Sequence, residues 1–282
     1  LWLWSSHIRD FSSCDIDHCK AAADKILVDI ERSVLADELL RRRGLDRQVE
    51  SASLVQSSRL PSAQPSHADY EIDGWTFQGQ ALGGNFHTWT VNRNGQICAA
   101  LGSAAHHGAA GAIVATSLQT VVETCWNSQH KPSQILRKAN DLLWGAEDGD
   151  WRSSLCYSNL NPKTGELVYS TAGTIQAFLF GSRGFRMLPC TSTMLAAQPD
   201  TRFETQQLKL EGGELLLIAS ADVVASAARG GLSQQGLLDV VRQMQDEPVD
   251  AIVDHLRRIL PMAKVDEPAD YDRSLMLVRR RF

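Results

Sequence analysis

The spacing of apolar residues changes near residue 60, and this change limits how the chain can fold. Between residues 21 and 55, apolar side chains recur every three or four positions among charged residues, which is the spacing of one face of an amphipathic helix. Gly44 interrupts the pattern, so we expect a kinked helix or a pair of helices. Residues 57–66 contain two prolines and four serines, which favour an extended connection. We therefore predict a helical segment, residues 1–60, followed by a domain of residues 61–282.

The helical segment has two interpretations. Its apolar face would be buried if the helix packed on its own domain. Alternatively, the helix is a signalling linker that pairs with a second copy as a coiled coil and gives a homodimer; the sequence contains too few regular heptads to decide. Because the chain starts at Leu1 rather than at methionine, we expect this segment to be the remnant of a longer upstream region.

After residue 61, short runs typical of strands surround a pair of helical segments. The strand-like runs are residues 71–77, 87–91, 97–101, 154–160, 166–171, 176–180, 203–210, 214–219 and 274–279. The helical segments are residues 108–126 and 132–144, and a third follows at 234–260. Runs of strands interrupted by paired helices, rather than strict strand–helix alternation, indicate an α+β domain.

Composition excludes several classes of function. The formal net charge of −5 gives no electrostatic reason to bind nucleic acid, and we interpret the basic residues 279–281 as a solvated chain end. No apolar run approaches the roughly 20 residues of a membrane-spanning helix, so no membrane partner is expected. The six cysteines form no paired motif or dense framework, which is typical of a reducing compartment, and we expect a cytoplasmic protein.

Five short motifs occur in order between residues 83 and 275. They are Gly-Gly-Asn-Phe at 83–86, Gly-Ser-Ala-Ala-His-His-Gly at 102–108, Asn-Pro-Lys-Thr-Gly at 161–165 with Ala-Gly at 172–173, Leu-Leu-Ile-Ala-Ser-Ala-Asp at 216–222, and Tyr-Asp-Arg-Ser-Leu at 271–275. Together with the Gln-Ser-Ser-Arg-Leu-Pro lead-in at 56–61, they resemble the PPM-type protein phosphatases, in the branch typified by stage II sporulation protein E and the RsbU-like regulators. The resemblance implies a four-layer αββα sandwich, with two central β-sheets flanked by helices.

The resemblance also implies a particular chemistry. Members of that family use two Mn²⁺ or Mg²⁺ ions to activate a water that attacks phosphoserine or phosphothreonine, and four of the motifs supply aspartate ligands. These positions fall here on Asn85, Ser103, Ala221 and Tyr271, none of which is a carboxylate. Hard cations need anionic oxygen ligands. We therefore expect a pseudophosphatase without a metal cofactor and without confident catalytic residues.

The alternative is an active serine/threonine phosphatase with a rearranged Mn²⁺ or Mg²⁺ site. Asp222 follows Ala221, and Asp270 and Asp272 flank Tyr271, although adjacent side chains on a strand point to opposite faces. His106, which stands where the family has glycine, is a further candidate ligand, but imidazole suits softer metals.

The inactive interpretation predicts a regulatory, protein-binding module in bacterial signal transduction. The resemblance implies a regulatory protein partner, such as an anti-sigma-antagonist-like phosphoprotein. A third hypothesis keeps the fold only as a structural or oligomerisation unit.

Overall fold

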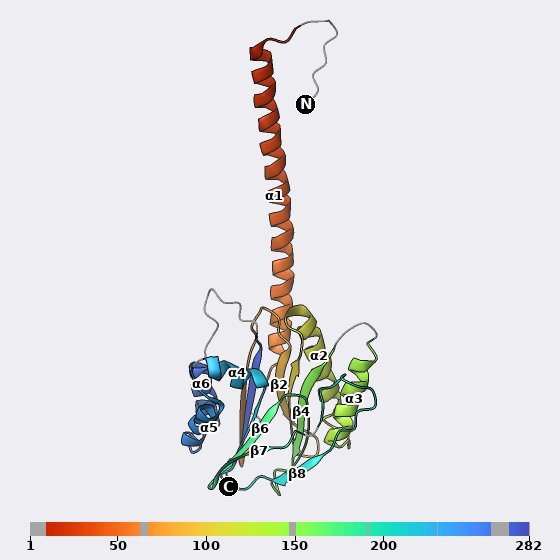
Figure 1. The fold of residues 1–282 in the computed structure, drawn as a ribbon. Helices are drawn as coiled ribbons and strands as arrows, with labels where there is room; N and C mark the ends of the chain where they lie inside the picture. The colour runs from red at the N-terminus through yellow and green to blue at the C-terminus, as the bar shows by residue number, and fades with distance from the viewer. Residues whose placement is uncertain are drawn as a thin grey trace. The chain divides into compact units, whose positions relative to one another are not determined.

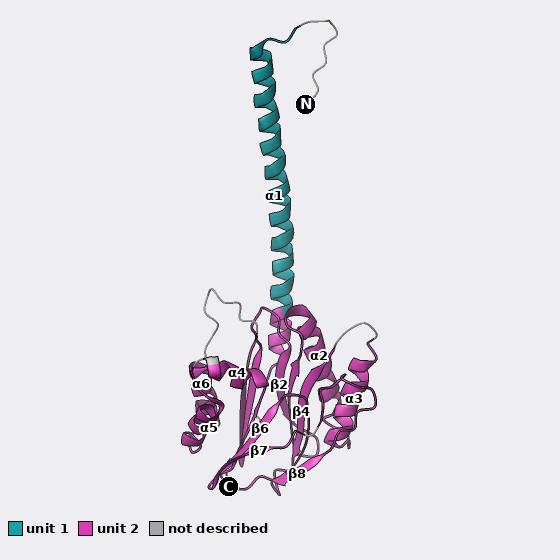
Figure 2. Ribbon diagram, viewed as in Figure 1, with its two compact units in different colours: residues 1–52 teal, residues 53–282 magenta. Residues whose placement is uncertain are grey.

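The structure is a computed structural model that describes residues 10–62, 67–146, 151–190, 192–229, 231–260 and 271–281 (Figure 1). Part of the predicted connection, residues 63–66, and the candidate ligand Asp270 lie outside these ranges. The chain forms two compact units, Leu1–Ala52 and Ser53–Phe282 (Figure 2). No helix among the described residues is long and apolar enough to cross a membrane.

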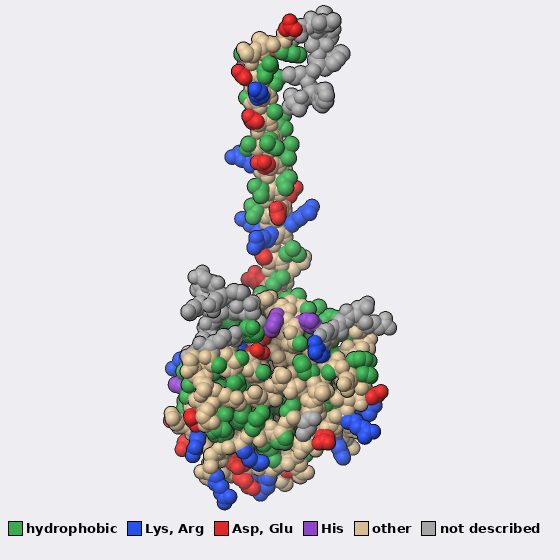
Figure 3. All heavy atoms as spheres, viewed as in Figure 1, with side chains coloured by type: hydrophobic (Ala, Val, Ile, Leu, Met, Phe, Trp, Pro, Cys, Tyr) green, Lys and Arg blue, Asp and Glu red, His purple; other side chains and the backbone are tan. Residues whose placement is uncertain are grey.

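A single long helix, α1 (Ser13–Ser58), occupies the described part of the first unit and ends in the second. It runs unbroken through Gly44, so the predicted interruption is wrong. A glycine inside a helix costs only about 1 kcal/mol relative to alanine, which strong helix formers on both sides can offset. Hydrophobic side chains lie exposed along α1 (Figure 3). Nine of them are more than half exposed: Leu27, Ile30, Val34, Leu35, Leu39, Leu40, Leu45, Leu54 and Val55.

The second unit contains two antiparallel five-stranded sheets. The first has the order β1 (Tyr70–Phe77), β10 (Arg273–Arg280), β9 (Leu215–Ala219), β6 (Gln176–Gly181) and β7 (Gly184–Leu188). The second has the order β2 (Asn85–Val91), β3 (Ile97–Ala104), β4 (Ser153–Leu160), β5 (Glu166–Ala172) and β8 (Gln206–Lys209).

Helices cover both outer faces of this sheet pair. Figure 1 shows α2 (Gly108–Cys125) and α3 (Pro132–Trp144) on one side, and α4 (Ala221–Arg229), α5 (Gln234–Gln243) and α6 (Val249–Ile259) on the other. This is the αββα sandwich predicted from the sequence.

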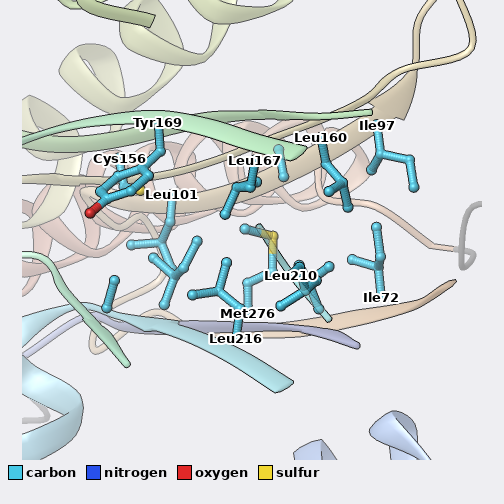
Figure 4. Close-up of a cluster of buried hydrophobic side chains, with 14 of the residues drawn as sticks. Ile72, Ile97, Leu101, Cys156, Leu160, Leu167, Tyr169, Leu210, Leu216 and Met276 are labelled. Carbon is cyan, nitrogen blue, oxygen red and sulfur yellow. The ribbon is translucent and has the colours of Figure 1, made fainter. Parts of the chain in front are cut away.

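Strand alternation explains the three apolar layers. On β3, Ala99 and Leu101 face the opposite sheet, whereas Cys98 and Ala100 face α2 and α3. Figure 4 shows the central layer, in which side chains from both sheets, such as Leu101 and Met276, point toward one another. A third cluster joins the outer face of the first sheet to α4, α5 and α6.

Four predictions need correction. Strand β7 and helix α4 were not predicted, and residues 234–260 form two helices rather than one. The basic C-terminal residues are not a solvated end, because Arg279 is buried and bonds the Glu247 carbonyl, with Glu71 3.6 Å away. Glu71 also pairs with Arg281 at 3.0 Å. These ion pairs connect the neighbouring strands β1 and β10, on which Glu71 and Arg279 are register partners.

Candidate functional site

The second sheet places two of the four substituted positions side by side. Asn85 on β2 is the register partner of Ser103 on β3, and Ser103 is in turn the partner of Ser154 on β4. Asn85 and Ser103 face the space between the sheets, because Trp89 and Leu101 on the same faces of these strands pack in the central layer. The second sheet therefore presents neutral polar groups at two of the four positions where the family resemblance implies aspartates.

The first sheet supplies the other two positions. Ser220 follows β9, and its amide donates to the Ser274 carbonyl at 2.9 Å, while the Ser274 amide donates to Ser220 Oγ at 3.1 Å. Ala221 comes next and begins α4, and Tyr271 lies two residues before β10. Our treatment of Asp222 as a strand residue is therefore wrong, since it lies in the first turn of α4.

Asp272 links the two sheets. Its side chain is buried, Oδ1 accepts a hydrogen bond from the Gly79 amide at 2.8 Å, and Oδ2 accepts one from the Gly84 amide. His107 Nδ1 lies 3.9 Å from the same Oδ2. The carboxylate that we considered as a rearranged metal ligand thus holds the loop that enters β2.

The glycines of this loop leave no room for side chains. A Cβ atom on Gly83 would lie 2.8 Å from Asp272 Oδ1, and one on Gly84 would lie 2.6 Å from the His106 carbonyl oxygen. Gln56, in the last turn of α1, holds Gly83 as well: its Nε2 donates to the Gly83 carbonyl at 2.6 Å, and its Oε1 accepts from the Gly83 amide at 3.2 Å. Sequence reasoning missed Gln56, for which the only signal was its place in the lead-in motif.

A buried histidine lies deeper between the sheets. His87 Nδ1 is 2.7 Å from Thr76 Oγ1, which is 2.6 Å from Ser274 Oγ. A Cβ on Gly74 would lie 2.8 Å from His87 Cδ2, so the ring packs directly on that glycine. Burial lowers the pKa of His87 from 6.5 to about 4, and the ring is neutral at pH 7.

Two buried nitrogen atoms face this region without a hydrogen-bond partner among the described residues. They are Asn85 Nδ2 and His87 Nε2. Asn85 Nδ2 is a hydrogen-bond donor, and His87 Nε2 is a donor or an acceptor depending on the tautomer of the ring. Neither supplies the anionic oxygen that a hard cation needs.

Aromatic contacts occupy the rim of the same end. The ring of half-exposed Tyr271 lies edge-on to His107, with centroids 6.0 Å apart. His106 lies edge-on to Trp151 at 5.7 Å. His106 therefore packs against an aromatic ring at this rim.

Within the ranges that the structure describes, the residues at this end of the sandwich do not fit two divalent cations. Among the described residues, no group of three or more His, Cys, Asp or Glu side chains is placed to hold a metal ion. Both oxygens of Asp272 already accept main-chain hydrogen bonds. The four positions taken from the motifs offer an amide, a hydroxyl, a methyl group and a phenol.

A separate groove of about 420 Å³ lies where the chain leaves α1. Arg59, Glu123, Trp126 and residues 88–91 line it, together with Pro61 and Ser62. Arg59 pairs with Glu123 at 2.8 Å, and Gln119 Nε2 donates to the Arg59 carbonyl at 2.8 Å. These bonds fasten the segment after α1 to α2.

Comparisons with known proteins agree on the family and the fold. The model of the stage II sporulation protein E (SpoIIE) family matches residues 93–281. The chain is similar to phosphoserine phosphatase RsbU of Bacillus subtilis, with 18% identity over 246 residues that cover 85% of this chain and 72% of that protein.

Solved structures show the same fold at low identity. The SiaA-PP2C domain of Pseudomonas aeruginosa superposes with a TM-score of 0.72 at 15% identity, over 84% of this chain and 98% of that one. The RsbU and RsbW domains of Rv1364c from Mycobacterium tuberculosis give a TM-score of 0.60 at 18% identity, over 75% and 60%.

Proposed function

The chain belongs to the stage II sporulation protein E (SpoIIE) family, and we propose that it uses the phosphatase fold as a protein-binding regulatory module without hydrolysing phosphoesters. One observation carries the proposal. The positions at which we expect metal ligands, Asn85, Ser103, Ala221 and Tyr271, offer no carboxylate, and the carboxylate beside them, Asp272, is bonded to Gly79 and Gly84.

Electrostatics supports the loss of metal binding. Two divalent cations held close together repel each other, and only nearby negative charge offsets that repulsion. Replacing four carboxylates by neutral groups removes most of it, so we expect the affinity for Mn²⁺ or Mg²⁺ to fall by orders of magnitude. The phenol of Tyr271 is neutral at pH 7 and bulky, which adds to the effect.

The partner that this proposal favours is a regulatory protein of bacterial signalling. The Bacillus relative is a phosphoserine phosphatase by name, and the Mycobacterium structure contains an RsbW domain beside the RsbU domain. A fold that recognised a phosphoprotein can keep its recognition surface after losing its metals. We therefore propose an anti-sigma-antagonist-like phosphoprotein as the partner, and the cytoplasm as the location.

We also propose that α1 pairs with a second copy. Its exposed apolar side chains are interleaved with charges of both signs, as in helices that associate through one face. An isolated helix gains little stability from propensity alone and usually needs a packed apolar face. The domain boundary that we propose, at residue 60, lies just after the end of α1.

Calorimetric titration with Mn²⁺, together with hydrolysis of a generic phosphoester across a series of metals, tests the proposal. We expect no saturable binding and no turnover above the buffer rate. Saturable two-site Mn²⁺ binding, with turnover abolished by Asp222→Ala or Asp272→Ala, would instead establish an active phosphatase with a rearranged site.

A further inference from the structure

Residues 78–84, which we call the crossover loop, connect the two sheets at the end of the sandwich where Asn85 lies. The loop leaves β1 of the first sheet after Phe77 and enters β2 of the second sheet at Asn85. Its position therefore sets the position of Asn85. Any element that fixes or releases this loop therefore acts on the position of Asn85.

Gln56 holds the loop from the side of α1. It is the buried residue of that helix, and its amide makes two hydrogen bonds to one residue, Gly83. Burying a primary amide is costly unless its donor and acceptor are both satisfied. The paired bonds to Gly83 satisfy both, which explains why a polar side chain is buried there.

Asp272 holds the same loop from the side of β10, through the amides of Gly79 and Gly84. The loop has little room to move between its contacts with Gln56 and Asp272, because Gly83 packs against Asp272 and Gly84 packs against the His106 carbonyl. A displacement at Gly83 must therefore move Gly84 and the start of β2.

The chain just beyond Gln56 is fixed in the same unit. Arg59 bonds Glu123 and Thr120 on α2, and its carbonyl accepts from Gln119. The C-terminal turn of α1 thus lies between two attachments, one to the crossover loop and one to α2. Fraying of this turn has to break or strain the bonds of Gln56.

We propose that Gln56 is a positioning residue that couples the C-terminal turn of α1 to Asn85, at the start of β2, through the crossover loop. Order in the last turn of α1 keeps Gly83 in place, and loss of that order loosens the loop and Asn85. The coupling links the pairing that we propose for α1 to the position of Asn85 in the domain. The regulatory meaning rests on the proposed function, whereas the coupling itself does not.

Hydrogen–deuterium exchange of peptides covering residues 78–86 in the full chain tests the coupling. Gln56→Met keeps the size of the side chain and removes both hydrogen bonds, so we expect exchange there to accelerate about tenfold, in line with two lost bonds. Gln48→Met, an exposed glutamine on the same helix, is the matched control and should leave exchange unchanged. If Gln56→Met does not fold, Gln56→Glu, which keeps the acceptor, replaces it.

A second pair of variants tests transmission along the helix. Val55 is 65% exposed, so Val55→Ala and Val55→Gly differ chiefly in helix propensity, by about 1 kcal/mol. We expect exchange at residues 78–86 to be up to about fivefold faster in the glycine variant than in the alanine variant. In the Gln56→Met background that difference should vanish.

Equal exchange in Gln56→Met and the unmodified chain overturns the inference, as does a glycine effect that persists in the Gln56→Met background. Both measurements are made without partner or metal. If the exchange experiments contradict the coupling, the proposed regulatory function is unaffected. Mn²⁺-dependent turnover would instead contradict the proposed function and leave the coupling unaffected.

Discussion

Asp272 fixes the crossover loop, which connects the two sheets. Its carboxylate accepts charge-assisted hydrogen bonds from Gly79 and Gly84, and it is buried. Asp272→Asn keeps the shape but loses the charge and turns one acceptor into a donor that faces a main-chain amide. We expect the free energy of unfolding to fall by about 2–4 kcal/mol, measured by urea denaturation.

The matched control for this prediction is Asp246→Asn, an exposed aspartate in the same unit. Its effect should stay within about 0.5 kcal/mol. A similarly small effect of Asp272→Asn would mean that the carboxylate does not hold the crossover loop.

His87 gives the domain a pH-dependent stability. Its pKa is about 4 in the folded chain, whereas an unfolded chain has the ordinary value of 6.5. Between these values the unfolded state binds more protons, so stability is complete above pH 6.5 and is lost as the pH falls toward 4. From the two pKa values we expect a loss of about 2 kcal/mol between pH 7 and pH 5.

The variant His87→Gln separates this contribution from that of the carboxylates. The pH dependence of urea denaturation should be shallower in the variant by about the same 2 kcal/mol over this range. Parallel curves for the variant and the unmodified chain would show that His87 does not titrate in this window.

Sequence reasoning identified residues that lie together at one end of the sandwich, but not their roles. The motifs named Asn85 and Ser103, which the structure places as strand partners. The hydrogen bond from Gly79 to Asp272 joins residues that are 193 positions apart in the sequence, and local spacing carries no information about such a contact. The burial of His87 likewise depends on Gly74 and Thr76, which lie on the other sheet.

At the scale of elements, prediction succeeded where periodicity was strong. Pro132–Trp144 was predicted with its observed bounds, because its apolar spacing and N-terminal proline both indicate a helix. Helix α4 was missed because it has only nine residues and begins two residues after the end of β9, which is too short a run for a helical period to stand out. Strand β7 was missed because Arg186 and Met187 are exposed at a sheet edge.

Pairing of α1 gives a prediction at the same scale. Leu27, Ile30 and Val34 lie on one helix face and are each more than half exposed. We expect the full chain to be a dimer in analytical ultracentrifugation. Replacing all three by glutamate should weaken association by about a thousandfold or more, given 1.5–3 kcal/mol for each buried apolar side chain.

Arg32→Glu provides the control, because residue 32 lies on the opposite side of the helix from Ile30. It changes charge without touching the apolar face and should leave the dimer intact. A monomeric unmodified chain, or a triple variant that dimerises as well as the unmodified one, would contradict pairing through this face.

For the whole molecule, shared fold and shared chemistry have to be argued separately. The likeness to the SiaA-PP2C domain at 15% identity reflects strand order and layer packing, which depend on apolar periodicity. Catalysis would depend on a few carboxylates at the sheet ends. Those positions are not among the residues of the central layer, such as Leu101 and Met276, so the fold does not require carboxylates at them.

Metal-dependent stability tests this separation on the intact chain. A ligand that binds only the folded state raises stability by RT ln(1 + [L]/Kd), about 2.7 kcal/mol at a hundredfold excess over Kd. Without carboxylate ligands this gain is absent, so Mn²⁺ and EDTA should leave the melting temperature unchanged to within about 1 °C. In a variant that combines Asn85→Asp, Ser103→Asp, Ala221→Asp and Tyr271→Asp, saturating Mn²⁺ should raise the melting temperature by about 5–10 °C over the EDTA value. A rise of that size in the unmodified chain would mean that other side chains hold the metals and that the domain has kept the means for catalysis.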